Sequence, residues 1–157
     1  MSATLQNPHR VCIAGASGRM GQMLVDAVRV SGDCVLSGAL DIPSSPAIGL
    51  DAGAFVGKAT GVAITADLAT GLSGSQFLID FTRPEGTLAH LRECVKHGVK
   101  VVIGTTGFTE AQKAEIAEAS KSIAIMMAPN MSVGVNVTLK LLEMAAKALA
   151  VSYTHLT

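Results

Sequence analysis

Three glycines, Gly15, Gly18 and Gly21, follow a short apolar run at three-residue spacing. The run itself, residues 11–14, is typical of a strand buried on both faces of a parallel sheet. Beyond the glycines, apolar residues recur at the spacing of one helix face: Met20, Met23, Leu24, Ala27 and Val28. A strand, a glycine-rich turn and a helix together can hold a pyrophosphate. Glycine lets the backbone approach the anion, and the helix N-terminus offers unpaired N–H groups to it.

A single acidic residue stands where this arrangement could use one. Asp41 lies 20 residues after Gly21, at the end of a second apolar run over residues 34–40. A carboxylate there can accept hydrogen bonds from the ribose hydroxyls of an adenine dinucleotide. The glycine spacing differs from the commoner G-x-G-x-x-G pattern, so the alternative stays open that the turn is structural and Asp41 an ordinary loop residue.

The composition sets limits on both the fold and the partners. The chain has 157 residues, of which 49% are hydrophobic, with 12 basic and 12 acidic side chains. We expect one domain over residues 1–150 and a tail of uncertain origin over 151–157. The balanced charge predicts no nucleic-acid or membrane partner. The three cysteines are interpreted as buried, reduced thiols of a cytoplasmic protein, and no metal-ligating pattern is found.

Strand and helix signals alternate along the rest of the chain. Strands are predicted over residues 62–65, 77–81, 100–103 and 122–128. Helices are predicted over 67–72, from an N-cap at Thr82 to Gly98, from an N-cap at Thr109 onward, and over 133–150. This alternation predicts an α/β fold, a Rossmann-type doubly wound parallel sheet with helices on both faces. In such a sheet, the segments 15–21, 81–83, 104–107 and 128–131 meet at the carboxyl edge, where ligands bind.

These four segments resemble the cofactor domain of the 4-hydroxy-tetrahydrodipicolinate reductase (dihydrodipicolinate reductase) family, which acts in the diaminopimelate route to lysine. The matching stretches are Ile-Ala-Gly-Ala-Ser-Gly-Arg-Met-Gly at 13–21, Asp-Phe-Thr-Arg-Pro-Glu-Gly-Thr at 80–87, Val-Ile-Gly-Thr-Thr-Gly-Phe at 102–108 and Ala-Pro-Asn-Met-Ser-Val-Gly-Val-Asn at 128–136. They occur in the family's order and at its spacing, and the similarity extends over residues 10–148.

The resemblance implies a cofactor role for each segment. The pyrophosphate would lie on Gly15, Ala16, Ser17, Gly18, Arg19 and Met20, and the adenosine ribose on Asp41. Gly104, Thr105 and Thr106 would line the nicotinamide ribose, and Ala128, Pro129, Asn130 and Met131 would contact the nicotinamide. Alternatives stay open for three positions: Thr105 and Thr106 could cap a turn, and Asn130 could cap a helix. Arg83 lies either near the cofactor or in solvent at a helix start.

Two departures from the family pattern bear on function. Many members have a basic residue after the ribose-binding acid, where this chain has Ile42. Asp41 would repel a 2′-phosphate, so of NADH and NADPH we expect NADH to be favoured unless Arg19 compensates. The second departure is length, because members continue for roughly another hundred residues into a substrate domain. That domain supplies the catalytic lysine, a segment rich in histidine and arginine, and a Gly-Thr pair for a substrate carboxylate.

The resemblance therefore implies the cofactor half of a reductase. The full-length enzyme, expected to be a homo-oligomer (a tetramer), transfers a hydride from NAD(P)H to a small cyclic dicarboxylate, with loss of water. No catalytic residue is expected in this chain, which should be inactive alone, and His9, His90, His97 and His155 are interpreted as surface or core residues. Three alternatives remain: another amino-acid-pathway dehydrogenase, a non-catalytic nucleotide- or coenzyme-A-binding module, and a purely structural domain.

Overall fold

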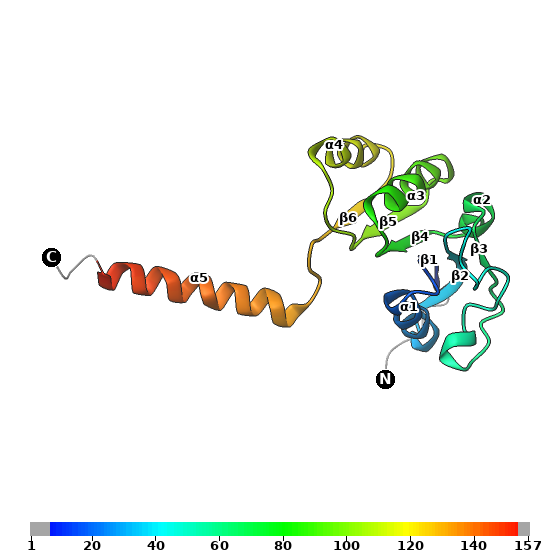
Figure 1. Cartoon of the computed structure of the whole chain (residues 1–157), viewed down its shortest axis with the longest axis horizontal. Helices are drawn as coiled ribbons and strands as arrows, with labels where there is room; N and C mark the ends of the chain where they lie inside the picture. Colours follow the sequence, from blue (N-terminus) through cyan, green and yellow to red (C-terminus); the bar gives the residue numbers. More distant parts are fainter. Residues whose placement is uncertain (1–6, 154–157) are drawn as a thin grey trace. The chain divides into compact units, whose positions relative to one another are not determined.

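The structure is a computed structural model that describes residues 7–153. It divides into two compact units, the first ending at Met127 and the second beginning at Ala128, and each is described by itself. The first unit contains a six-stranded sheet, coloured blue to yellow along the sequence in Figure 1. Its strands are β1 (His9–Ala14), β2 (Cys34–Leu40), β3 (Ile64–Thr65), β4 (Phe77–Asp80), β5 (Lys100–Ile103) and β6 (Ile125–Met127).

The strand order and direction match the predicted fold class. The order is β3-β2-β1-β4-β5-β6, and every neighbouring pair is parallel. The chain runs outward from β1 to one edge, then returns to β4 and runs to the other edge, which is the doubly wound order of a Rossmann sheet. The carboxyl ends of β1 and β4 are neighbours at the point where the direction reverses, and ligands of such sheets bind there.

Helices lie on both faces of the sheet. They are α1 (Arg19–Val30), α2 (Leu68–Leu72), α3 (Pro84–His97) and α4 (Glu110–Ala119), with a short 3₁₀ helix, η1 (Ala54–Val56), in the loop after β2. Val11 and Ile13 of β1 pack with Val25 and Val28 of α1. The alternate residues of the sheet form a second core with α2, α3 and α4, so successive side chains of β1 and of β4 supply opposite cores.

Local signals set most of the helix ends. Gly98 ends α3 with a positive φ of 67°, and Thr109 begins α4 with a complete capping box to Gln112. Pro84 occupies the first turn of α3, where its fixed φ suits a helix start. Strand β6 is shorter than predicted, covering only three residues of the 122–128 run.

Two sequence predictions about these elements are wrong. Thr82 does not cap α3; the N-cap is Arg83, and the Thr82 hydroxyl donates instead to Asp80 at 2.7 Å. The buried face of α1 is also different from the predicted stripe, since Met20 is 46% and Met23 is 70% exposed. The helix packs on the sheet through Gly21, Val25 and Val28. The glycine lets the helix lie close to the turn, and this rotates the methionines away from the core.

The second unit contains one helix, α5 (Val133–Tyr153). The helix extends three residues beyond the predicted end, so the first part of the predicted tail continues it. The remaining residues of that tail, 154–157, and His155 among them, lie outside the described residues. Of the three cysteines, all free, Cys12 and Cys94 are buried as predicted, whereas Cys34 is only half-buried at the start of β2.

Candidate functional site

The glycine turn between β1 and α1 requires glycine at two of its three positions. Gly15 has a positive φ of 67°, a conformation that side chains disfavour. The N–H of Gly18 closes the turn by donating to the Gly15 carbonyl at 2.9 Å. At Gly21 a Cβ atom would lie 2.0 Å from the Gly15 carbonyl oxygen, so only glycine allows the helix to come this close to the turn. The spacing of the motif therefore has a geometric cause.

The N-terminus of α1 carries the features of an anion site. Its N-cap is Gly18, which has no side chain, and no hydrogen bond from a side chain of the described residues caps the helix there. The first turn contains no acidic residue, but it begins with Arg19. The N–H groups of this turn, with the positive end of the helix dipole, are thus available for an anion.

Asp41 joins the end of β2 to this turn. One carboxylate oxygen accepts the N–H of Ser17 at 3.0 Å, and the other accepts the N–H of Ile42 at 2.8 Å. Asp41 thus helps to shape the turn. The carboxylate is half-buried and retains acceptor capacity, because each oxygen can accept more than one hydrogen bond. The hydroxyl of Ser17 lies 3.4 Å from that of Ser45 in the following loop.

A hollow of about 520 Å³ opens beside the turn. Four of the predicted cofactor residues line it, together with Phe81 and the exposed Met23; the four are Gly15, Gly18, Arg19 and Met20. Met20 and Met23, which do not pack in the core, therefore border this hollow. It is bounded by the glycine turn on one side and by the residue that follows β4 on the other.

The segment after β5 packs directly on the segment after β4. At Gly104 a Cβ atom would lie 2.0 Å from the Phe81 ring, so the ring occupies the space of the missing side chain. Thr105 is buried at 3% exposure, whereas Thr106 is exposed. The sequence patterns did not distinguish these two threonines, but their environments differ. Thr105 belongs to a polar network, and Thr106 faces solvent.

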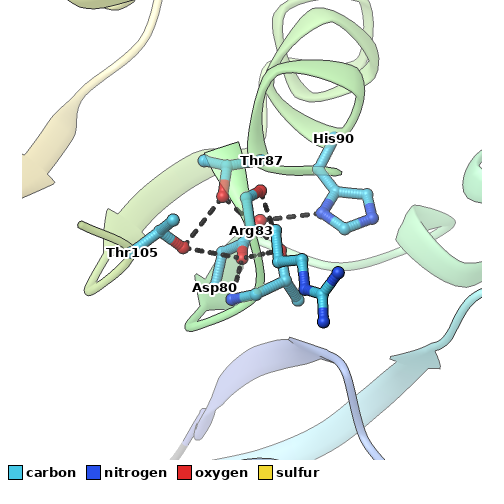
Figure 2. A network of polar contacts seen from close by, with 6 residues as sticks. Asp80, Arg83, Thr87, His90 and Thr105 are labelled. Atoms are coloured by element: carbon cyan, nitrogen blue, oxygen red, sulfur yellow. Dashed lines mark hydrogen bonds and ion pairs between the residues drawn. The ribbon is translucent and has the colours of Figure 1, made fainter. Parts of the chain in front are cut away.

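That network centres on Asp80, a residue to which the sequence patterns gave no role. The Asp80 carboxylate is fully buried at the end of β4 and contacts Thr82, His90 and Thr105. Figure 2 shows the contacts with His90 and Thr105. A carboxylate inside the apolar run 77–81 is a sequence signal that could have identified it, because a buried charge needs partners. His90, interpreted as a surface or core residue, is a hydrogen-bond partner of Asp80, with Nδ1 lying 2.7 Å from the carboxylate.

Arg83 lies beside the network without taking part in it through its charge. Its guanidinium points away from the Asp80 carboxylate in Figure 2, and its side chain is exposed. Of the other described histidines, His97 pairs with Glu93 on the surface of α3, and His9 packs edge-on against Phe77. Among residues 7–153, no group of three His, Cys, Asp or Glu side chains could hold a metal ion.

The fourth predicted segment belongs to the second unit. There the Asn130 side chain accepts the N–H of Ser132 at 2.9 Å, and the Ser132 hydroxyl accepts the N–H of Val135 at 3.4 Å. Ser132 therefore occupies the capping position of α5, and Asn130 forms a turn just before it. Pro129 and Met131 are exposed.

Comparison with known proteins gives the family. The sequence model described as "Dihydrodipicolinate reductase, N-terminus" matches residues 9–131. The chain belongs to this reductase family. Among curated relatives, the 4-hydroxy-tetrahydrodipicolinate reductase of Herminiimonas arsenicoxydans is 62% identical over 147 residues, which are 94% of this chain and 55% of that protein. The enzyme of the same name from Cupriavidus taiwanensis is 63% identical over 143 residues, 91% of this chain and 54% of that protein.

A solved structure of a reductase of this family shares the fold. It is the dipicolinate-bound dihydrodipicolinate reductase from Paenisporosarcina sp. TG-14, with a TM-score of 0.71 and 25% identity, covering 89% of this chain and 54% of that one. The WlbA dehydrogenase from Chromobacterium violaceum, solved with NADH, is similar in fold alone, with a TM-score of 0.61 and 18% identity. The chain spans about half the length of the reductases it matches. Within residues 7–153, no helix combines the length and apolarity needed to cross a membrane.

Proposed function

We propose that this chain is the cofactor-binding part of a 4-hydroxy-tetrahydrodipicolinate reductase, and that it binds NADH or NADPH. The observation that carries the proposal is the glycine turn leading into an α1 N-terminus without a side-chain cap, with Asp41 hydrogen-bonded to that turn. The residues fit a dinucleotide. Backbone N–H groups face the place for a pyrophosphate, and a carboxylate stands at the end of the neighbouring strand, where ribose hydroxyls would lie.

The glycine turn and the other predicted segments would then each bind a different part of the cofactor. The N–H groups at the start of α1 would hold the pyrophosphate, and Arg19 would add positive charge at the mouth of the hollow. Gly104 and the threonines after it would hold the nicotinamide-ribose end, where the Phe81 ring limits the space. By the family resemblance, Ala128, Pro129, Asn130 and Met131 would contact the nicotinamide. When bound, the reduced cofactor supplies a hydride; these residues would orient it and exclude water around it.

The substrate and assembly of the whole enzyme follow from the same family membership. We infer a cyclic dicarboxylate substrate, a tetramer for the full-length protein and a cytoplasmic location, with the three free cysteines supporting the last. The resemblance places the catalytic lysine and the carboxylate-binding residues outside these 157 residues. We therefore expect the chain alone to bind the cofactor and to leave it unoxidised when 4-hydroxy-tetrahydrodipicolinate is added.

NADH should bind more tightly than NADPH. The Asp41 carboxylate would repel a 2′-phosphate by roughly 1 to 4 kcal/mol, and about 1.4 kcal/mol corresponds to a tenfold difference in affinity. Ile42, 63% exposed, provides no compensating charge. Arg19 is the nearby cation of the turn that could offset the repulsion, so removing it should widen the preference for NADH.

Calorimetric titration of the 157-residue chain with NADH, and separately with NADPH, tests the proposal. Asp41→Ala should weaken NADH binding and reduce the difference between the two cofactors. Asp33→Ala is the matched control, because Asp33 is an exposed carboxylate just before the other end of the same strand. If a chain that melts cooperatively binds neither cofactor, the proposal is wrong. If the two aspartate variants behave alike, the role of Asp41 is wrong.

A further inference from the structure

Asp80 is a fully buried carboxylate with a complete set of partners. One oxygen accepts the Thr82 N–H at 2.8 Å, the Thr82 hydroxyl at 2.7 Å and the Thr105 hydroxyl at 3.4 Å. The other oxygen lies 2.7 Å from Nδ1 of His90. Among the described residues, no buried side-chain nitrogen or oxygen lacks a partner. The charge is thus held by several groups at once, as a buried carboxylate requires.

The network favours the charged form of Asp80. Burial raises the pKa of this carboxyl, but the hydrogen bond and charge of His90, with the two hydrogen bonds from Thr82, lower it by more. A carboxylate can only accept hydrogen bonds, so Nδ1 of His90 must carry a hydrogen. The imidazole is 14% exposed, and it donates to Asp80 from the second turn of α3.

These contacts join three segments of the chain. Asp80 lies at the end of β4, Thr87 and His90 lie on α3, and Thr105 lies after β5 (Figure 2). Thr82 follows β4 by two residues. The Thr87 hydroxyl, fully buried, donates to the Thr105 hydroxyl at 2.9 Å. Thr105 is therefore held from two sides, by Thr87 on the helix and by Asp80 on the strand.

The network also reaches the glycine turn. A Cβ atom at Gly15 would lie 3.0 Å from the Thr82 methyl group, so the turn after β1 packs against the turn after β4. The turns after β1, β4 and β5, which this network connects, all lie at the carboxyl edge of the sheet. Two residues before Asp80, on the same face of β4, lies Leu78, an apolar residue that packs in the core. Replacing a buried charged cluster by apolar packing is often neutral or stabilising, so stability alone does not account for a carboxylate at this position.

We propose that Asp80, His90 and Thr87 are positioning residues that hold Thr105 and, through it, the segment 104–106 in the conformation that receives the nicotinamide-ribose end of the cofactor. The inference rests on the proposed function and assigns it a supporting layer of residues that do not touch the cofactor themselves. Loss of a hydrogen bond in this layer should leave the adenosine end unaffected, because that end depends on the glycine turn and Asp41.

The test compares NADH with ADP, which lacks both the nicotinamide and the ribose attached to it. Thr87→Val removes the hydroxyl that holds Thr105, and Thr87→Ser keeps it; His90→Leu removes the donor to Asp80, and His90→Asn keeps one at the position of Nδ1. We expect the Val and Leu variants to bind NADH about tenfold more weakly, as for the loss of one buried hydrogen bond. Their affinity for ADP should change less than about twofold, and the Ser and Asn variants should bind NADH nearly as the unmodified chain does.

Two controls make the outcomes distinguishable. His97→Leu removes an exposed histidine from the last turn of the same helix and should leave both affinities unchanged. Thermal melts check that each variant is folded at the temperature of titration. Equal losses for NADH and ADP, or no loss for NADH in either the Val or the Leu variant, overturn the positioning role. An unmodified chain that is folded and binds neither ligand overturns the proposed function itself.

Discussion

The three glycines at the turn after β1 are evenly spaced in the sequence, but they differ in how much space a side chain would have. A Cβ atom at Gly21 would meet the Gly15 carbonyl oxygen at 2.0 Å, whereas at Gly18 the same oxygen would be 3.2 Å away. Gly21→Ala must therefore push α1 away from the turn. We expect it to destabilise the fold by about 1 to 3 kcal/mol, typical of an overpacked site, and to weaken NADH binding. Gly18→Ala should be milder on both counts, and urea unfolding with calorimetry would show whether this order holds.

A second prediction at the residue scale concerns Asp51 in the loop after β2. Its carboxylate accepts the N–H groups of Gly53, Thr60 and Gly61 and the Thr60 hydroxyl. The backbone hydrogen bonds of Thr60 and Gly53 are the main cause that lowers the pKa of Asp51 from 3.8 to about 2. Because the folded pKa is the lower one, this stabilisation is complete above pH 3.8 and is lost as the pH falls toward 2.

The test for Asp51 is the urea midpoint measured between about pH 6 and pH 2. Asp51→Asn should be less stable than the unmodified chain at neutral pH, and the difference should shrink in acid. Asp80, whose pKa is also lowered, titrates in both proteins and cancels in this comparison. A difference that stays constant with pH would contradict the assignment to Asp51.

At the scale of elements, the cap of α4 offers a direct measure of a local signal. Thr109 accepts the N–H of Gln112 at 3.3 Å, and the Gln112 side chain accepts the N–H of Thr109 at 2.8 Å. Thr109→Ala removes one half of this box and should cost about 1 kcal/mol of unfolding free energy. Thr109→Ser, which keeps the hydroxyl, should cost little. Equal losses in the two variants would mean that the Thr109 methyl group, and not its hydrogen bond, supports the helix.

Such local signals explain which elements the sequence could predict. Gly98 and the Thr109 box act on their own neighbours, so the ends of α3 and α4 follow from a few adjacent residues. The buried face of α1 does not, because it depends on how close Gly21 lets the helix approach the turn. Thr82 has the residue type of an N-cap, but a buried carboxylate two residues earlier competes for its hydroxyl. That competition is a tertiary effect, which a pattern of residue types cannot show.

The residues of the candidate site also differ in whether the sequence alone could predict them. Residues that act through the backbone, such as Gly15 and Gly21, are recognisable from spacing, because the geometry demands glycine there. The Asp80 network was missed because its members come from three segments and meet only when β4, α3 and β5 are assembled. Asp41 was found by its place after β2, yet its hydrogen bond to Ser17 could not be predicted without the turn's shape.

For the whole molecule, the parallel order of the sheet brings three of the four predicted segments to one edge within the first unit. The fourth, residues 128–131, belongs to the second unit, and its assignment to the nicotinamide comes from the family resemblance. A chain ending at Met127 separates these contributions. It retains the glycine turn, Asp41 and the Asp80 network, so we expect it to melt cooperatively and to bind ADP-ribose as the 157-residue chain does.

NADH should distinguish the two chains. If residues 128–131 contact the nicotinamide, the shortened chain binds NADH about as weakly as ADP-ribose, whereas the longer chain gains additional affinity from the nicotinamide. Asn130→Ala in the longer chain is the point-variant counterpart, and it should lose part of that gain if the amide contributes. Equal NADH affinity in both chains would limit the cofactor site to the first unit. The Asn130 side chain would then serve only the turn before α5, where it accepts the N–H of Ser132.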